Sequence, residues 1–157
     1  MPSAPTLARV LCATDLSDFG NRAVPFAFSI TPDDGVLTLL HVLHTPALPS
    51  PLLPHYGEKH ASPEELARAE RACAERLEAR AREAAGTRRI DWQVRVVRGA
   101  QVSDAILAEA ARDDAQLICL ATHAREGLAK LVLGSTTHDV LHRAGRPVLL
   151  IPPLVTG

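Results

Sequence analysis

The sequence has no surplus of either charge and no long apolar run. Lysine and arginine together number 17 against 18 for aspartate and glutamate, which gives a formal net charge of -1, and the charges are interspersed. Such a chain lacks the basic field that binds the phosphate backbone, so we expect no nucleic acid partner. No run approaches the roughly 20 apolar residues that cross a bilayer, and residues 1–9 lack the apolar stretch of a signal peptide. We therefore expect no membrane association and a cytoplasmic protein.

Cysteine is also scarce, and its spacing excludes two kinds of stabilised fold. Cys12, Cys73 and Cys119 include no CxxC pair, and their number is odd. This argues against a disulfide framework and against a structural zinc site. Cys12 and Cys119 lie in apolar runs and Cys73 in a helical pattern, so all three are interpreted as packing residues.

Glycine-rich nucleotide loops are missing after the first apolar run. The segment TDLSDFG has neither the Ser-Gly-Gly type of loop expected of an ATP-cleaving or adenylyl-transferring enzyme nor the GxGxxG of a dinucleotide oxidoreductase. We therefore set both of these enzyme classes aside.

Apolar runs and helical patterns alternate along the 157 residues, a length that suits one domain spanning residues 1–157. The runs that read as strands are residues 8–14, 36–43, 92–97, 117–122 and 147–151. Strict alternation favours parallel strands joined by right-handed crossovers. The sequence therefore predicts an α/β three-layer sandwich with a five-stranded parallel sheet and four helices.

The clearest helix is expected over residues 62–85. Ser62 suits the N-cap, Pro63 the first turn, Glu65 a capping box and Gly86 the position after the end. Other helices are expected over about 17–30, where Pro25 should bend or break the helix, over about 102–112, and from 135 to before Gly145. A proline-rich irregular stretch, residues 44–61, is interpreted as a flap beside the strand ends or a partner-contacting loop.

In an open α/β sheet the ligand crevice lies at the carboxyl ends of the strands, where the strand order reverses. Thr14 and Asp15 end the first strand, and a carboxylate there can accept hydrogen bonds from ribose hydroxyls or a base amine. Capping of the next helix by Asp15 or Ser17 explains the same residues equally well.

Two histidine pairs raise the question of a metal site. His41 and His44 are three residues apart on a strand, where they face opposite sides, and no third ligand follows. His138 and His142 lie one helical turn apart in HDVLH, a near miss to HExxH with aspartate in place of glutamate. We expect no metal at either pair, and the backbone of Val42, between the first two, could instead read an adenine edge.

The stretch ATHAREGLAKLVLGS, residues 121–135, has the placement of a phosphate-binding loop. It leads into Gly134, Ser135, Thr136 and Thr137, where hydroxyls and the free amides of a helix start converge. The alternative is a serine N-cap with no ligand.

The chain strongly resembles the universal stress protein family over nearly its full length. The resemblance is carried by VLCATDLSDFGNRAV, LTLLHV and the block from VVRGAQVSDAIL to RPVLLIP. It implies a five-stranded α/β fold, an ATP site between the first and fourth strands, and a homodimer formed through the last strand. Asp15 and the backbone of Val42 would then hold ribose and adenine. The residues expected at this site are Ala13, Thr14, Asp15, Val42, Ala121, His123, Ala124, Arg125, Gly134, Ser135 and Thr136.

The family's ATP-binding members carry Gly, two residues, Gly, nine residues, Gly, then Ser or Thr. Here Ala121 and Ala124 replace the first two glycines, whereas Gly134 and Ser135 are kept. Alanine in place of a left-handed glycine costs on the order of 1 kcal/mol, roughly fivefold in affinity, and more if its methyl group collides with the ligand. Arg125 could pair with a phosphate oxygen or could simply be solvated.

Two functions remain open from the sequence. The first is a stress-response protein that binds ATP, with magnesium or manganese, as a sensor or switch with at most slow hydrolysis. The second is a nucleotide-free dimeric interaction protein whose phosphate loop is closed by the alanines. In either case an apolar edge strand needs a partner. The dimer would use the last strand, which consists of Pro147, Val148, Leu149, Leu150 and Ile151.

Overall fold

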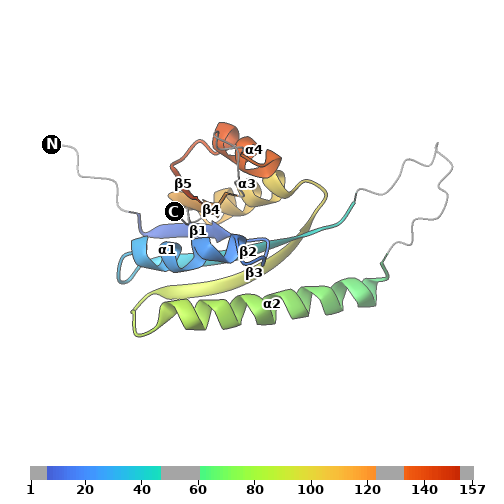
Figure 1. Cartoon of the computed structure of the whole chain (residues 1–157), viewed down its shortest axis with the longest axis horizontal. Coiled ribbons are helices and arrows are strands. Elements are labelled where there is room, and N and C mark those ends of the chain that lie inside the picture. The colour runs from blue at the N-terminus through green and yellow to red at the C-terminus, as the bar shows by residue number, and fades with distance from the viewer. Residues whose placement is uncertain (1–6, 47–60, 123–132, 153–157) are drawn as a thin grey trace, which may run out of the picture.

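The computed structural model describes residues 7–46, 61–122 and 133–152. In these residues five parallel strands form one sheet in the order β3-β2-β1-β4-β5, with helices on both faces (Figure 1). The strands are β1 (Arg9–Ala13), β2 (Val36–His44), β3 (Asp91–Gly99), β4 (Leu117–Ala121) and β5 (Val148–Ile151). The helices are α1 (Ala23–Ile30), α2 (Pro63–Ala85), α3 (Val102–Arg112), α4 (Ser135–Arg143) and a 3-10 turn, η1 (Gly20–Arg22). The predicted fold class is confirmed.

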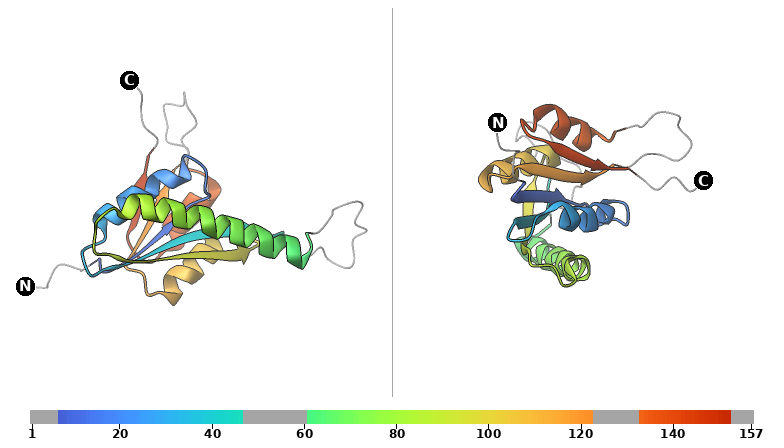
Figure 2. Two further views of the ribbon diagram at one scale, coloured as in Figure 1. Left: turned by 90° about the horizontal axis from the view of Figure 1, so that it is seen from below. Right: turned by 90° about the vertical axis from the view of Figure 1, so that its left-hand side faces the viewer.

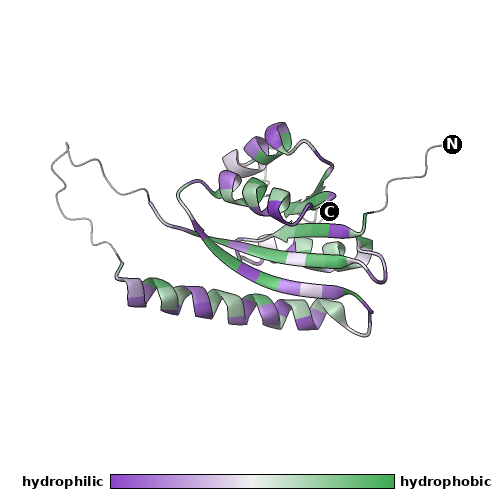
Figure 3. Cartoon of the chain, turned by 180° about the vertical axis from the view of Figure 1, so that it is seen from behind, coloured by the Kyte–Doolittle hydropathy of each residue, from purple (hydrophilic) through white to green (hydrophobic). Residues whose placement is uncertain are grey.

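Two apolar layers hold the sandwich together. Val10 and Cys12 of β1 point into the layer beneath α1 and α2, whereas Leu11 and Ala13 point into the layer beneath α3 and α4. This alternation follows from the two-residue period of a strand, and because both faces are covered the strands read as continuous apolar runs. Figure 2 shows α1 and α2 together on one side of the sheet, and Figure 3 shows β1 and β2 as mostly hydrophobic ribbons.

The cysteines occupy the packing positions expected of them. Cys12 and Cys119 are fully buried register partners on β1 and β4, and Cys73 is half-buried on α2. All three are free thiols. Among the described helices, none is long and apolar enough to cross a bilayer.

The caps of α2 are those that the sequence predicts. The Ser62 hydroxyl accepts a hydrogen bond from the Glu65 amide at 3.1 Å, and the Glu65 carboxylate accepts one from the Ser62 amide at 2.7 Å. Gly86, just past the end, has a φ of 52°, a left-handed value that glycine adopts without strain. Helix α2 is therefore fixed at both ends.

The prediction of a helix from about residue 17 was wrong at its start. Residues 17–19 form part of a loop, η1 follows, and α1 begins only at Ala23. Pro25 is the third residue of α1, where an amide has no acceptor within the helix, so the helix runs through it to Ile30. The expected irregular stretch also begins later than residue 44, since His44 ends β2, and residues 47–60 lie outside the described residues.

Candidate functional site

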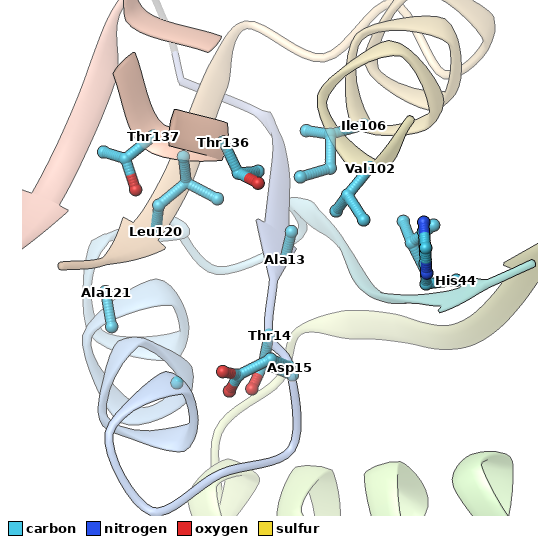
Figure 4. Close-up of a pocket in the computed structure, with 12 residues that line it drawn as sticks. Ala13, Thr14, Asp15, His44, Val102, Ile106, Leu120, Ala121, Thr136 and Thr137 are labelled. Carbon is cyan, nitrogen blue, oxygen red and sulfur yellow. The ribbon is translucent and has the colours of Figure 1, made fainter. Parts of the chain in front are cut away.

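A cavity of about 340 Å³ opens at the carboxyl ends of β1 and β4. From β1 the chain crosses to β2 and β3 on one side, and later returns to place β4 and β5 on the other. This reversal is the topological switch point where open α/β sheets bind ligands. The cavity is lined by Ala13, Thr14, Asp15, Gly20, Val42, His44, Val102, Ile106, Leu120, Ala121, Thr136 and Thr137 (Figure 4).

Six of the residues expected at the site line this cavity. They are Ala13, Thr14, Asp15, Val42, Ala121 and Thr136. Gly134 and Ser135 begin α4 but do not line the cavity. His123, Ala124 and Arg125 lie outside the described residues. The described residues that were expected at the site thus lie in two places, six at the cavity and two at the start of α4.

Sequence reasoning missed six lining residues. Three are apolar side chains that a pattern cannot separate from core: Val102 and Ile106 form an i, i+4 pair on α3, and Leu120 ends a buried run. His44, exposed at the end of β2, was considered only as a metal ligand. Thr137 was named only as part of the helix start, and Gly20 carried no motif. The available sequence signal was the pair Val102 and Ile106 at the start of α3, directly after β3. Helices that follow parallel strands begin at the carboxyl ends of those strands, which is the edge where the cavity lies.

The β1–η1 loop is held by side chains at both of its ends. Thr14 Oγ1 accepts a hydrogen bond from the Leu16 amide at 3.1 Å and lies 3.1 Å from Asn21 Oδ1. The Thr14 carbonyl lies 2.9 Å from Nδ1 of His41 on β2. Thr14 is itself buried, so the base of the loop is fixed to the sheet.

Asp15 is oriented by the residues that follow it. Its Oδ1 accepts hydrogen bonds from the Ser17 amide at 2.9 Å and from the Ser17 hydroxyl at 2.5 Å. Ser17 Oγ in turn accepts one from the amide of Gly20, the first residue of η1, at 3.0 Å. The alternative of helix capping by Asp15 or Ser17 was wrong, because the N-cap positions of η1 and α1 are Phe19 and Arg22 and neither has a side-chain cap. Ser17 instead binds the first amide of η1 from within the loop, and Asp15 binds Ser17. Asp15 nevertheless lies at the cavity wall.

Leu16 adopts a left-handed backbone conformation with a φ of 63°, which costs a residue with a side chain roughly 1–2 kcal/mol. Its side chain is buried, and its carbonyl accepts hydrogen bonds from Arg76 of α2 at 3.0 Å and from Asn21 at 3.3 Å. These contacts offset the strain. Helix α2 therefore supports the loop that presents Asp15.

The start of α4 forms the opposite wall. Gly134 occupies the N-cap position without a side-chain cap, so the alternative of a serine N-cap was wrong. The first amides of a helix have no partner within it, and this end carries partial positive charge. Thr136 and Thr137 line the cavity from this first turn (Figure 4). The Thr136 and Thr137 side chains and Asp15 therefore belong to opposite walls of the same cavity.

The histidines make separate contacts. His41 bonds the Thr14 carbonyl, and His44 Nε2 lies 3.1 Å from the Ala100 carbonyl. The rings of His138 and His142 pack against each other with centroids 4.3 Å apart. Within the described residues, no three histidine, cysteine, aspartate or glutamate side chains are grouped as metal ligands.

Ala121 stands where the resemblance expects glycine, yet its backbone is that of a strand. It pairs with Ile151, it is not among the residues with positive φ, and its methyl group packs against the apolar layer beneath α1 and α2. Leu120 points to the other side of the sheet (Figure 4). The methyl group of Ala121 therefore packs on the α1 side of the sheet, at the edge of the cavity that the residue lines.

Comparisons with known proteins agree with this architecture. The model of the universal stress protein family matches residues 6–152. A search of curated proteins found no match. A universal stress protein solved in complex with cAMP is 23% identical with a TM-score of 0.66, covering 94% of this chain and 98% of that one. The Archaeoglobus fulgidus protein in complex with dAMP is 18% identical with a TM-score of 0.60, covering 94% and 99%. UspA from Lactobacillus plantarum is 24% identical with a TM-score of 0.69, covering 94% and 99%.

Proposed function

The chain belongs to the universal stress protein family, and on that premise we propose that it binds an adenine nucleotide, ATP with magnesium or manganese, as a cytoplasmic stress sensor or switch. The observation that carries the proposal is the cavity at the switch point, with Asp15 on one wall and the first turn of α4 on the other. Two structural neighbours were solved with cAMP and dAMP, which supports the adenine nucleotide class.

The lining divides into an apolar and a polar half that suit the two ends of a nucleotide. Val42, Val102 and Ile106 offer apolar surface to a base, and the backbone of Val42 can pair with its edge. The Asp15 carboxylate can accept from ribose hydroxyls. Thr136 and the amides at the start of α4 can donate to phosphate oxygens, which a helix N-terminus favours. We assign no rapid catalytic step to these residues.

The loss of family glycines favours a second candidate, a nucleotide-free dimeric interaction protein. Ala121 and Ala124 replace two glycines of the ATP-binding pattern. The strand geometry of Ala121 weakens this candidate at one of the two positions. Both candidates include a homodimer formed through the last strand.

The edge formed by β5 supports the dimer, since β5 is the outermost strand on its side of the sheet. Phe28 of α1 contacts Trp92 of β3. Residues two apart on a helix point in nearly opposite directions, so Phe26, which is 48% exposed, is inferred to point toward the other flank of α1, where this helix contacts β5. On α4, Asp139 and Arg143 contact α3, so Leu141, which is 37% exposed, also lies on the β5 flank. Antiparallel pairing of β5 with a second copy would cover the edge and both side chains.

Calorimetric titration of ATP and AMP, with magnesium, tests nucleotide binding. We expect micromolar affinity that Asp15→Ala weakens about tenfold or more, because hydrogen bonds to a charged group contribute roughly 1.5–3 kcal/mol. Asp18→Ala is the matched control, since it removes the same charge from the same loop but does not line the cavity.

Two further results separate the candidates. Thr136→Val should weaken ATP more than adenosine, because only ATP places phosphates at the start of α4. Absence of heat and of any thermal shift with every nucleotide would rule out the sensor and leave the dimeric interaction protein.

A further inference from the structure

A second hollow lies on the other side of the β1–η1 loop, between that loop and α2. Two adjoining cavities of about 280 and 390 Å³ share Asp18, Asn21, Arg80 and Glu83 as lining residues. We call this hollow the α1–α2 groove. The loop separates it from the nucleotide cavity, since Asp15 lines one and Leu16 the other. Helices α1 and α2 lie side by side here (Figure 2).

Arg22 lines the groove with its donors unused. Its side chain is half-buried, and within the described part of the chain it makes no hydrogen bond or ion pair. A guanidinium has five N–H donors in a planar fork that matches a carboxylate. No nitrogen of Arg22 is both buried and unpaired, so its guanidinium reaches solvent at the groove and is available to a ligand that enters there.

The two arginines of α2 add exchangeable donors. Arg80 pairs with Glu83 at 3.2 Å, but the side chains are 47% and 73% exposed, and such surface pairs contribute little stability. Arg76 donates one N–H to the Leu16 carbonyl, which leaves its other donors available. A ligand can therefore displace Glu83 from Arg80 at small cost.

The charge and the walls of the groove define the ligand. The groove is lined by two carboxylates, those of Asp18 and Glu83, and by three guanidinium groups, those of Arg22, Arg76 and Arg80. The positive charges therefore exceed the negative ones by one, and a ligand with a single negative charge would balance them. Pro25 and Ala84 supply apolar surface beside Arg22. We propose that the α1–α2 groove binds a singly charged carboxylate carried on a short apolar chain, as in a short-chain carboxylic acid or the C-terminus of a peptide. This site does not depend on nucleotide binding.

The test is a heteronuclear NMR titration of the nucleotide-free protein with hexanoate. We expect shifts of the amides of Asp18–Arg22 and Ala79–Ala84 and of the Arg22 side chain, and no response to the neutral hexanamide. Arg22→Gln should weaken binding about tenfold, since it removes a bidentate charged contact. Arg71→Gln is the control, because Arg71 is an exposed arginine of α2 outside the groove.

A second variant and two further probes complete the test. Arg80→Gln should also weaken hexanoate binding, which keeps the proposal testable if Arg22→Gln misfolds. A dipeptide with a free C-terminus that binds more tightly than hexanoate and more tightly than its amide identifies a peptide ligand, whereas equal affinity identifies a small acid. The proposal is overturned if hexanoate causes no shift, if hexanamide binds equally, or if inorganic phosphate binds more tightly than hexanoate.

Discussion

A Cβ atom placed on Gly20 would lie 2.1 Å from Oδ1 of Asp15 and 2.8 Å from Oγ1 of Thr14. It would also lie 3.0 Å from the Asp15 amide, so rotation of the carboxylate alone does not make room. The first residue of η1 and the carboxylate at the cavity wall are therefore packed in direct contact. Any side chain at position 20 must displace the loop that presents Asp15.

We expect Gly20→Ala to lower the free energy of unfolding by about 1–3 kcal/mol, the usual cost of overpacking, and to weaken nucleotide binding about tenfold. Urea denaturation and calorimetry measure the two effects. Gly134→Ala is the control for crowding, because nothing lies within 4 Å of the position that its new methyl group would take, and it should cost no more than about 1 kcal/mol, the loss expected for alanine at an N-cap. Unchanged stability and affinity in Gly20→Ala would show that the loop moves freely.

Ala121→Gly should restore little affinity. The methyl group of Ala121 packs toward α1, and its strand backbone needs no left-handed conformation. We expect less than about a threefold gain for ATP and a loss of stability of about 0.5–1 kcal/mol, the cost of glycine within a strand. Titration of both proteins under one condition measures this, and a gain of tenfold would show that the family glycine is needed at this position.

The architecture followed from the sequence because its signals are local and repeated. Buried parallel strands give continuous apolar runs, and α2 carries a complete set of cap residues. The start of α1 did not follow, because the bonds from Asp15 to Ser17 and from Ser17 to Gly20 use the residues that would otherwise begin a helix. Such side-chain bonds compete with the helix and leave no periodic trace.

The site was predictable where topology alone places residues together. Asp15 and Val42 follow strands, and the carboxyl ends of parallel strands meet at one edge. Val102 and Ile106 were not predicted as site residues, because apolar positions on an amphipathic helix indicate core until the neighbouring wall is known. Gly20 was not predicted because its constraint is a contact with Asp15, five positions earlier.

Phe26→Asp should dissociate the proposed dimer. Phe26 is 48% exposed on α1, and the proposed pairing of β5 would bring it into the interface, where a charge would be buried without a partner. We expect the dissociation constant to rise at least about tenfold in sedimentation experiments. A charge at Leu149 or Leu150 should act similarly but also threaten folding, since both pack partly against the core.

The control for that experiment is Val36→Asp. Val36 is another exposed apolar residue, 38% exposed, but it lies at the start of β2, away from the β5 edge. Its replacement should leave self-association unchanged. A monomeric unaltered protein at high concentration would contradict the dimer.

Alkaline pH should destabilise the fold through Cys12. The hydrogen bond with Cys119 and complete burial raise the pKa of the Cys12 thiol well above its ordinary value. The folded state then holds its proton at a pH where the unfolded chain, with an ordinary pKa of about 8.5, has lost it. Stability from this group is thus fully present below about pH 8.5 and falls as pH rises toward the folded pKa. Chemical denaturation from pH 7 to 10 should show a steeper decline for the unaltered protein than for Cys12→Ala, and parallel curves would contradict this assignment.

Arg95→Met should destabilise the contact between β3 and α3 more than any exposed pair would. Arg95 lies 2.5 Å from Glu109 and 3.0 Å from Asp113, and all three side chains are less than one-fifth exposed. Methionine keeps the side-chain length but leaves two poorly hydrated carboxylates without their cation, so we expect a loss of about 2–3 kcal/mol in urea denaturation. Arg82→Met, which breaks an exposed pair with Glu78, should cost less than about 0.5 kcal/mol. Equal effects of the two variants would show that the Arg95 cluster is hydrated as well as a surface pair.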